Sequence, residues 1–317
     1  MSRKVFSRFA APAAALLAAS ALAGCGSTSS GSGGSPLAPK PSASGTVVVG
    51  SDNFPESILL ADVYGQALAA KGIKVSYNLN IGSREVTYNL VKSGALTLKP
   101  EYNGALLSYL DKTAAQTSVS EVDTAITAHV ASGLEILDPS TAQDNDTLTL
   151  SKQEAATLGL SQGATISDFV SKLGGKSITI GGSPEFQTRT QGMVGLEQQY
   201  GLKASQVNYK TLDAGGPLTE KALTSGQVDA GDLFTTDPTI SQGGLLTLVD
   251  DKNIFGVQNV LPLINKAGLS QSGIDALNAV SAKLDSTALL TMDTDVQVQK
   301  QDPLTVANAW LKSEGLS

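Results

Sequence analysis

The strongest constraint on the fold of this chain is a pattern that returns at a fixed distance of 132 residues. A glycine that ends a β-branched run, a glycine that follows a helical pattern, and an aromatic residue after a strand-like run each recur at that distance. The three pairs are Gly50 and Gly182, Gly94 and Gly226, and Tyr102 and Phe234. A constant spacing of strand, turn and helix signals predicts two lobes built on one plan.

Strand-like and helix-like segments alternate through both halves, which predicts an α/β fold with a central sheet flanked by helices in each lobe. The first half reads as strands at 46–51 and 73–80 around a helix; the second half reads as strands at 176–182 and 206–213. Ligands of open α/β sheets bind beyond the carboxyl ends of the strands. The loops "GSDNFPES" (50–57) and "GGSPEFQT" (181–188) are therefore expected to face a cleft between the lobes.

We expect the first lobe to begin with residues 46–141, the second lobe to comprise 142–240, and the chain to return to the first lobe over 241–317. Two strands, at 245–253 and 259–265, are expected in this last part. Two helices should follow, the second beginning with Asp302 as N-cap and Pro303 at its first position.

The first 45 residues predict secretion and anchoring. Basic residues precede a short apolar run at 9–22, which is typical of a signal peptide over residues 1–24 and is shorter than the roughly 20 residues of a membrane span. Cys25, the single cysteine, closes the sequence L-A-G-C, which resembles the lipobox of bacterial lipoproteins. A Ser-, Gly- and Pro-rich tether over 25–45 would follow. We expect an extracytoplasmic protein held to the cell membrane through lipidated Cys25.

Composition excludes several functions. The net charge of −7 and the scattered basic residues argue against nucleic acid as a partner. The chain has no P-loop motif, and its single histidine, His129, lies in a helical pattern that begins with the capping residues Ser118 and Glu121. No metal or other cofactor is expected, and no enzyme activity. A secreted two-lobed hydrolase that uses carboxylates, and a sensor or adhesion module, are the alternatives from other classes.

Four segments resemble one known family. "VVVGSDNFPESILLADVYGQAL", "GALTLKPEYNG", "GSPEFQTRTQGMVGL" and "LFTTDPTI" look like the substrate-binding lipoproteins of ABC importers for glycine betaine, choline, carnitine and proline. The resemblance covers Thr46 to Trp310. It implies a hinged fold like that of type II periplasmic binding proteins. It also implies a monomer that binds an osmoprotectant and docks on a membrane permease driven by a separate ATPase.

In that family a cage of tyrosines surrounds a quaternary ammonium group, through cation–π attraction. Tyr102 in "PEYNG" matches one cage position, and Phe234 falls where a second cage tyrosine is expected. Ser57, Ala105 and Leu148 depart from the family pattern. These departures leave open an alternative with the same transport role and a different small ligand, aromatic or carboxylated.

Further ligand-binding candidates lie in the loops that follow the predicted strands. Asn53 and Phe54 would supply a polar contact and an apolar wall. Ser83 and Arg84 follow a second predicted strand, and Arg84 either binds a carboxylate with two hydrogen bonds or lies on the surface. Arg189 is either a second clamp or an ion pair between the lobes. The remaining candidates are Asn145 and Asp146, expected at the hinge or the cleft, and Thr236 and Asp237, which either contact the ligand or form a turn before Pro238.

Overall fold

The computed structural model of this chain describes residues 45–114, 117–242 and 244–317. The expected signal peptide, Cys25 and all but the last residue of the tether lie outside the described residues.

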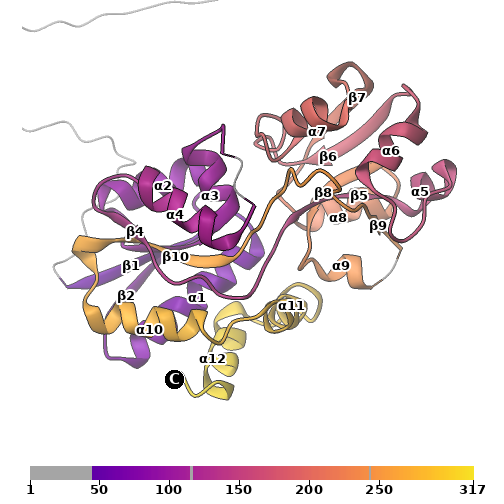
Figure 1. The fold of residues 1–317 in the computed structure, drawn as a ribbon. Coiled ribbons are helices and arrows are strands. Elements are labelled where there is room, and N and C mark those ends of the chain that lie inside the picture. Colours follow the sequence, from indigo (N-terminus) through magenta and orange to yellow (C-terminus); the bar gives the residue numbers. More distant parts are fainter. Residues whose placement is uncertain (1–44, 115–116, 243) are drawn as a thin grey trace, which may run out of the picture. The chain divides into compact units, whose positions relative to one another are not determined.

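Ten strands form two five-stranded sheets, which we call the first and second lobe together with their helices (Figure 1). The first sheet has the order β2-β1-β3-β10-β4 and the second has the order β7-β6-β8-β5-β9. The strands are β1 (Thr46–Gly50), β2 (Lys74–Asn78), β3 (Leu98–Tyr102), β4 (Leu134–Ile136), β5 (Asp146–Leu150), β6 (Ile178–Gly182), β7 (Val207–Thr211), β8 (Ala230–Phe234), β9 (Leu246–Thr247) and β10 (Val260–Asn265).

The two sheets share one topology. In the first, β1 runs parallel to β2 and β3 while β10 pairs antiparallel with β3. In the second, β6 runs parallel to β7 and β8 while β5 pairs antiparallel with β8. Gly50 and Gly182 end β1 and β6, which are the second strands of the two orders, and Tyr102 and Phe234 end the central strands β3 and β8. The prediction of two lobes on one plan is confirmed.

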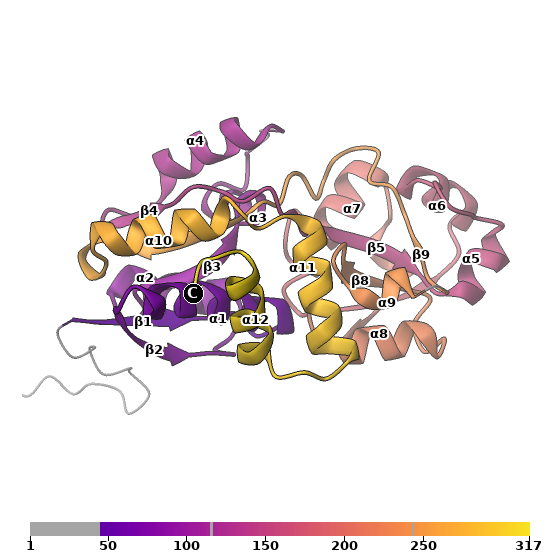
Figure 2. The same cartoon turned by 90° about the horizontal axis from the view of Figure 1, so that it is seen from below.

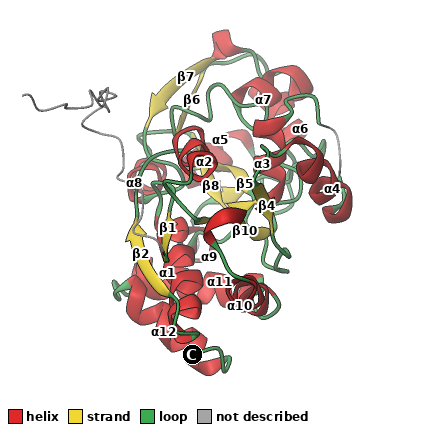
Figure 3. Ribbon diagram, turned by 90° about the vertical axis from the view of Figure 1, so that its left-hand side faces the viewer, coloured by secondary structure: helices red, strands yellow, loops and turns green. Residues whose placement is uncertain are grey.

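Helices cover both faces of each sheet (Figures 1 and 3). In the first lobe they are α1 (Pro55–Ala70), α2 (Arg84–Ser93), α3 (Asn103–Leu110), α4 (Val119–His129), α10 (Gln271–Ser281), α11 (Ser286–Asp293) and α12 (Pro303–Ser313). In the second they are α5 (Lys152–Leu158), α6 (Ile166–Leu173), α7 (Met193–Tyr200), α8 (Pro217–Thr224) and α9 (Pro238–Ser241). Short 3₁₀ turns span Ala204–Gln206 and Lys266–Gly268, and a π-helical turn spans Thr294–Val298.

Helix α1 is the centre of the first core. It begins with Pro55 at its first position, where the missing N–H costs nothing, and it packs against α10, α11 and α12 as well as its own sheet. Leu59, Leu60 and Leu68 are fully buried, and burying such a side chain contributes about 1.5–3 kcal/mol. α1 therefore fixes the loop before it, which contributes to the site described below.

Two chain segments cross between the lobes, residues 137–145 before β5 and residues 248–259 before β10 (Figure 1). They pair with each other, because Gln143 and Asn259 form an antiparallel bridge and the Asp144 amide donates to the Gln258 carbonyl at 3.1 Å. The side chain of Asn145 donates to the Gly256 carbonyl and ties the two segments a second time.

The structure corrects the expected return of the chain at residue 241. Strand β9 pairs with β5 in the second sheet, and Leu246 and Leu248 are buried in the second core. The second lobe therefore keeps the chain beyond residue 241, because these leucines complete its core. Helix α11 was not expected. Figure 2 shows it between α12 of the first lobe and α8 and α9 of the second.

The predicted helix starts are confirmed. Ser118 and Glu121 form a capping box at α4, and the Asp302 carboxylate accepts the Thr305 amide at the start of α12. His129 is exposed at the end of α4, where its Nδ1 lies 2.8 Å from the Ala125 carbonyl oxygen, so it has a local partner on its own helix.

Candidate functional site

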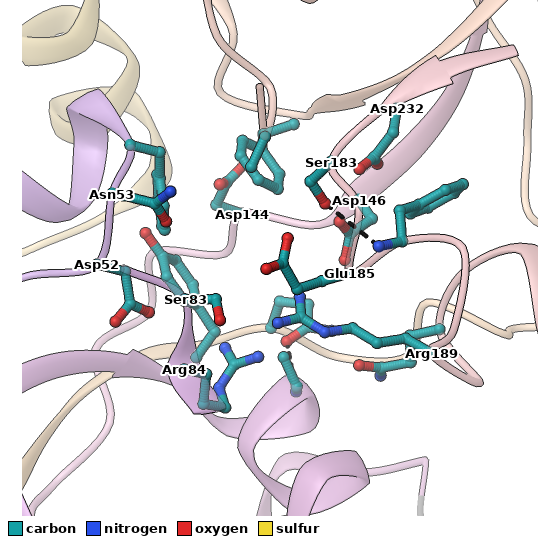
Figure 4. A pocket seen from close by; sticks show the side chains of 18 residues that line it. Asp52, Asn53, Ser83, Arg84, Asp144, Asp146, Ser183, Glu185, Arg189 and Asp232 are labelled. Atoms are coloured by element: carbon teal, nitrogen blue, oxygen red, sulfur yellow. Dashed lines mark hydrogen bonds between the residues drawn. The ribbon is translucent and has the colours of Figure 1, made fainter. Parts of the chain in front are cut away.

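A cavity lies at the carboxyl ends of β1, β3, β6 and β8, and side chains from both lobes and the crossing segment line it (Figure 4). This is the place where the topology of two open parallel sheets leads one to expect a ligand. The lining residues are Asp52, Asn53, Phe54, Ser83, Arg84, Tyr102, Ala105, Asp144, Asp146, Ser183, Glu185, Phe186, Arg189, Gln191, Ala214, Asp232, Phe234 and Gln258.

The structure brings together most of the side chains that the sequence singled out. Those that line the cavity are Asn53, Phe54, Ser83, Arg84, Tyr102, Asp146, Arg189 and Phe234. The others, Asn145, Thr236 and Asp237, do not line it. Asn145 joins the crossing segments, the Thr236 hydroxyl donates to Glu56, and Asp237 caps α9 by accepting the Thr239 amide. Of the two roles expected for Thr236 and Asp237, the structure therefore shows the turn before Pro238.

Three aromatic rings form one wall of the cavity. The ring centroids of Phe54 and Tyr102 are 6.1 Å apart, and those of Phe54 and Phe234 are 5.3 Å apart, with tilted planes. Gly215, at φ +56°, lies against the Phe234 ring, where a Cβ would come within 2.3 Å of the ring. This glycine is required for the ring to occupy its place.

A buried ionic network lies behind the first-lobe part of the cavity. The Lys99 ammonium donates to Asp52 at 2.8 Å, to Glu101 at 2.9 Å and to the Thr87 hydroxyl at 3.0 Å, and its side chain is 0% exposed. The Arg84 Nε donates to both Glu101 oxygens at 3.0 Å. Buried charges are tolerated when they are paired in this way.

These contacts decide the charge states. Burial opposes ionisation of Glu101, but Arg84 and then Lys99 lower its pKa below the usual range. Burial likewise acts to lower the pKa of Arg84, and the Glu101 carboxylate raises it above the usual value. The terminal nitrogens of Arg84 point toward the cavity (Figure 4), so the network holds a fixed positive charge there.

Arg189 contacts the other lobe. Its Nη2 donates to both oxygens of Glu85, on the first turn of α2, at 3.1 Å, and the hydroxyl groups of Ser108 and Thr190 lie 2.8 Å apart beside it. Of the two roles expected for Arg189, the ion pair between the lobes is therefore present. The same side chain also lines the cavity.

The second-lobe part of the cavity is acidic. Asp146 and Asp232 lie on the adjoining strands β5 and β8, and their carboxyl groups influence each other. Burial and then the charge of Asp146 raise the pKa of Asp232 well above its usual range. Burial also raises the pKa of Asp146, although Arg189, Arg84 and Asp232 oppose the rise. Burial and mutual repulsion therefore both oppose full ionisation of this pair.

A second group of acids joins the lobes beneath the aromatic wall. Glu56 accepts hydrogen bonds from the Tyr102 hydroxyl at 2.5 Å and from the Thr236 hydroxyl at 2.6 Å. Burial and then the charge of Asp293 raise the pKa of Glu56 well above its usual range. Burial raises the pKa of Asp293 to about 7.

The departures from the family pattern have structural explanations. Leu148 is fully buried in the second core, and the Ser57 hydroxyl accepts the Asp52 amide, so neither side chain lines the cavity. Ala105 does line it. No group of histidine, cysteine and acidic side chains in the described part of the chain is arranged to hold a metal ion.

Sequence reasoning missed Lys99, Glu101, Asp232 and Glu185. The signal for the first two was "LKPEY", in which charged residues occupy a strand that is buried along its whole length. Lysine and glutamate are rarely fully buried unless they are paired. Asp232 carried a similar signal in "AGDLF", a strand with a single polar side chain.

Comparison with known proteins gives a consistent result. Residues 45–313 match the family model described as the substrate-binding domain of the ABC-type glycine betaine transport system. A glycine-betaine-binding protein of Pseudomonas aeruginosa is 27% identical over 86% of this chain and 88% of its own length. A glycine betaine-binding protein of Escherichia coli is 28% identical over 86% of this chain and 92% of its own.

Among solved structures, a glycine betaine/carnitine/choline ABC transporter protein superposes with a TM-score of 0.65 at 18% identity. The match covers 85% of this chain and 99% of the other. This agreement establishes the two-lobed α/β fold of type II periplasmic binding proteins. No helix among the described residues is long and apolar enough to span a membrane.

Replacing Lys99 tests the buried network. We expect Lys99→Met to lower the free energy of unfolding by about 3–5 kcal/mol, because Asp52 and Glu101 then share a buried site without a cation. Urea unfolding followed by circular dichroism measures the change. The control is Lys283→Met, at an exposed lysine whose Nζ lies 3.9 Å from Glu314 Oε2. This substitution should change the free energy of unfolding by at most about 0.5 kcal/mol. Equal, small effects of both changes would contradict this role.

Replacing Asp293 tests the acid group beneath the wall. A carboxyl group whose pKa is raised from 3.8 to about 7 on folding stabilises the protein fully below its unfolded pKa, and this contribution disappears as the pH rises through 7. Asp293→Asn keeps the shape without the charge. At pH 8 we expect it to be roughly 1–3 kcal/mol more stable than the wild type, with a shallower dependence between pH 5 and pH 8.

Urea unfolding at pH 5, 6, 7 and 8 measures this dependence. The control is Asp138→Asn, at an exposed position, which should follow the wild-type curve. An Asp293→Asn variant that is less stable than the wild type at every pH would contradict this prediction, because it would show that the ionised carboxylate stabilises the folded protein.

Proposed function

Because this chain belongs to the family of substrate-binding domains of ABC-type glycine betaine transport systems, we propose that its cavity binds a small zwitterion of the glycine betaine type. Members of this family are transport proteins, not enzymes, and they work outside the cytoplasm with the membrane permease of an ABC importer. The observation that carries the proposal is that an aromatic wall and two arginines line the same cavity.

The aromatic wall is suited to the cationic end of such a ligand. A methylated ammonium group is attracted to the negative faces of aromatic rings, and the attraction reaches about 2 kcal/mol when the pair is shielded from water. The rings of Phe54, Tyr102 and Phe234 contact one another in a row, so a cation placed against Phe54 meets its neighbours as well. In this proposal the ring of Phe234 supplies the attraction without a hydroxyl group.

The arginines are suited to the carboxylate end. Arg84 is fixed by Glu101 from behind, so its terminal nitrogens are oriented before a ligand arrives. Arg189 approaches from the second lobe. A carboxylate between the two guanidinium groups would be bound by charge-assisted hydrogen bonds, the strong class.

Ligand binding is proposed to favour closure of the two lobes. The crossing segments 137–145 and 248–259 form the connection about which the lobes would move, with Asn145 as a tie between them. The Arg189–Glu85 pair joins the lobes at the rim. A ligand that contacts both lobes would shift the equilibrium toward the closed form, which would then dock on the permease.

Attachment to the membrane is proposed to occur through Cys25, and the protein is proposed to act as a monomer. The L-A-G-C sequence places the cysteine at the cleavage point of a lipoprotein signal, and several acyl chains hold a protein firmly to a membrane. The tether after it would let the two lobes reach the permease.

A ring replacement tests the cavity. Glycine betaine, choline, carnitine and proline are titrated calorimetrically into the purified protein, and at least one should bind. For the tightest of them we expect Phe234→Leu to weaken binding about thirtyfold, since the cation–π attraction is lost while an apolar side chain remains. The matched control is Phe169→Leu in the second core, which should lower stability and leave affinity unchanged. Absence of binding by all four compounds would overturn the proposal.

A cysteine replacement tests the anchor. We expect the wild-type chain, expressed in a bacterium that processes lipoproteins, to sediment with membranes and to incorporate labelled palmitate. Cys25→Ser should abolish the label and release the protein into the soluble extracytoplasmic fraction. A label that persists in the variant would contradict lipidation at Cys25.

A further inference from the structure

We infer that the cavity selects a cation carrying at least one N–H group, so that a partly methylated amino-acid zwitterion binds more tightly than its permethylated counterpart. The inference rests on the proposed function and concerns the chemistry of the cationic centre. The residues that carry it are Asp146 and Asp232, which face the cavity across from the arginines (Figure 4).

The register of the second sheet places an acid beside the aromatic wall. Asp146 pairs directly with Phe234 across β5 and β8. Directly paired residues of neighbouring strands have their Cβ atoms about 4.5–5.5 Å apart on one face of the sheet. A cation held against the Phe234 ring is therefore within reach of the Asp146 carboxyl group.

Asp232 has an unused hydrogen-bonding capacity. The residue is 2% exposed, and its Oδ1 accepts no hydrogen bond from an amide or hydroxyl group of the described residues. Figure 4 shows its carboxyl group turned toward Asp146 and Ser183. Buried carboxyl oxygens normally have donors, so an empty acceptor at a cavity wall indicates a donor supplied by a ligand.

The fold makes room for this acid. A Cβ on Gly182 would come within 3.0 Å of the Asp232 Cβ and 2.7 Å of the Tyr209 hydroxyl, so the glycine that ends β6 permits the approach of both side chains. The other charged groups around the pair are Asp144 on the crossing segment, Glu185 in the loop after β6, and Arg84 and Arg189. The acids outnumber the arginines here, which favours a cation.

The buried acids next to Arg84 in the first lobe already have cations as partners. These acids, Asp52 and Glu101, accept hydrogen bonds from Lys99, and Glu101 also accepts from Arg84. Asp146 and Asp232, in contrast, have no cation in hydrogen-bonding contact among the described residues. A trimethylammonium group would present methyl groups to these oxygens and leave them without donors, whereas a dimethylammonium group directs one N–H to the acids and its methyl groups to the rings.

The test compares N,N-dimethylglycine with glycine betaine, which differ by one methyl group on nitrogen. Calorimetric titration of the wild-type protein should give an affinity at least about tenfold higher for dimethylglycine, the range expected of a charge-assisted hydrogen bond. Asp146→Asn keeps the shape and removes the charge that faces the ligand. We expect it to reduce the preference to about threefold or less, mainly by weakening dimethylglycine binding.

Two further variants keep the outcome decisive. Asp146→Asn/Asp232→Asn removes both acids and should abolish the preference, and Asp138→Asn, at an exposed position, should retain it. Thermal unfolding shows whether each variant is folded. The comparison of dimethylglycine with glycine betaine on the wild-type protein does not depend on the variants. Glycine betaine binding as tightly as dimethylglycine, or a preference that survives in both cavity variants, would overturn the inference and leave the proposed function standing. Binding of neither compound, nor of any in the earlier panel, would overturn both.

Discussion

The ammonium group of Lys99, buried between Asp52 and Glu101, is the interaction on which the cavity depends. It compensates the buried charges on and beside β3, the strand that ends at Tyr102. Glu101, which it holds, also accepts the Tyr102 amide and orients Arg84. Breaking such a contact leaves uncompensated charge in a medium of low polarity, which is why the network is an all-or-none feature.

The two lobes share a topology but treat charge differently. In the first lobe, Asp52 and Glu101 are paired with Lys99. The acids of the second lobe, Asp146 and Asp232, have no such cation, and burial raises the pKa of each. The two equivalent sheets therefore differ in how the buried acids at their strand ends are paired.

Much of the fold could be read from the sequence because its signals are local. Glycines after helices, β-branched runs and N-cap residues act within a few positions, and their repetition predicted two equivalent sheets. The return of the chain was placed too early at residue 241, because Leu246 and Leu248 belong to the second core through contacts with distant residues. Within the site, residues after strand ends were found, whereas Lys99 and Glu101 inside a strand were not.

The sequence by itself determined the two-lobed plan, the strand-end loops and the aromatic residues at equivalent positions, since these follow from short-range pattern and spacing. Only the tertiary structure decided which candidates share a cavity. Asn145, Thr236 and Asp237 are engaged elsewhere, while Asp146 meets Asp232 and Arg189 meets Glu85. Apart from the cap that Asp237 makes with the Thr239 amide, these contacts join residues more than 80 positions apart, and no local pattern records which neighbour that will be.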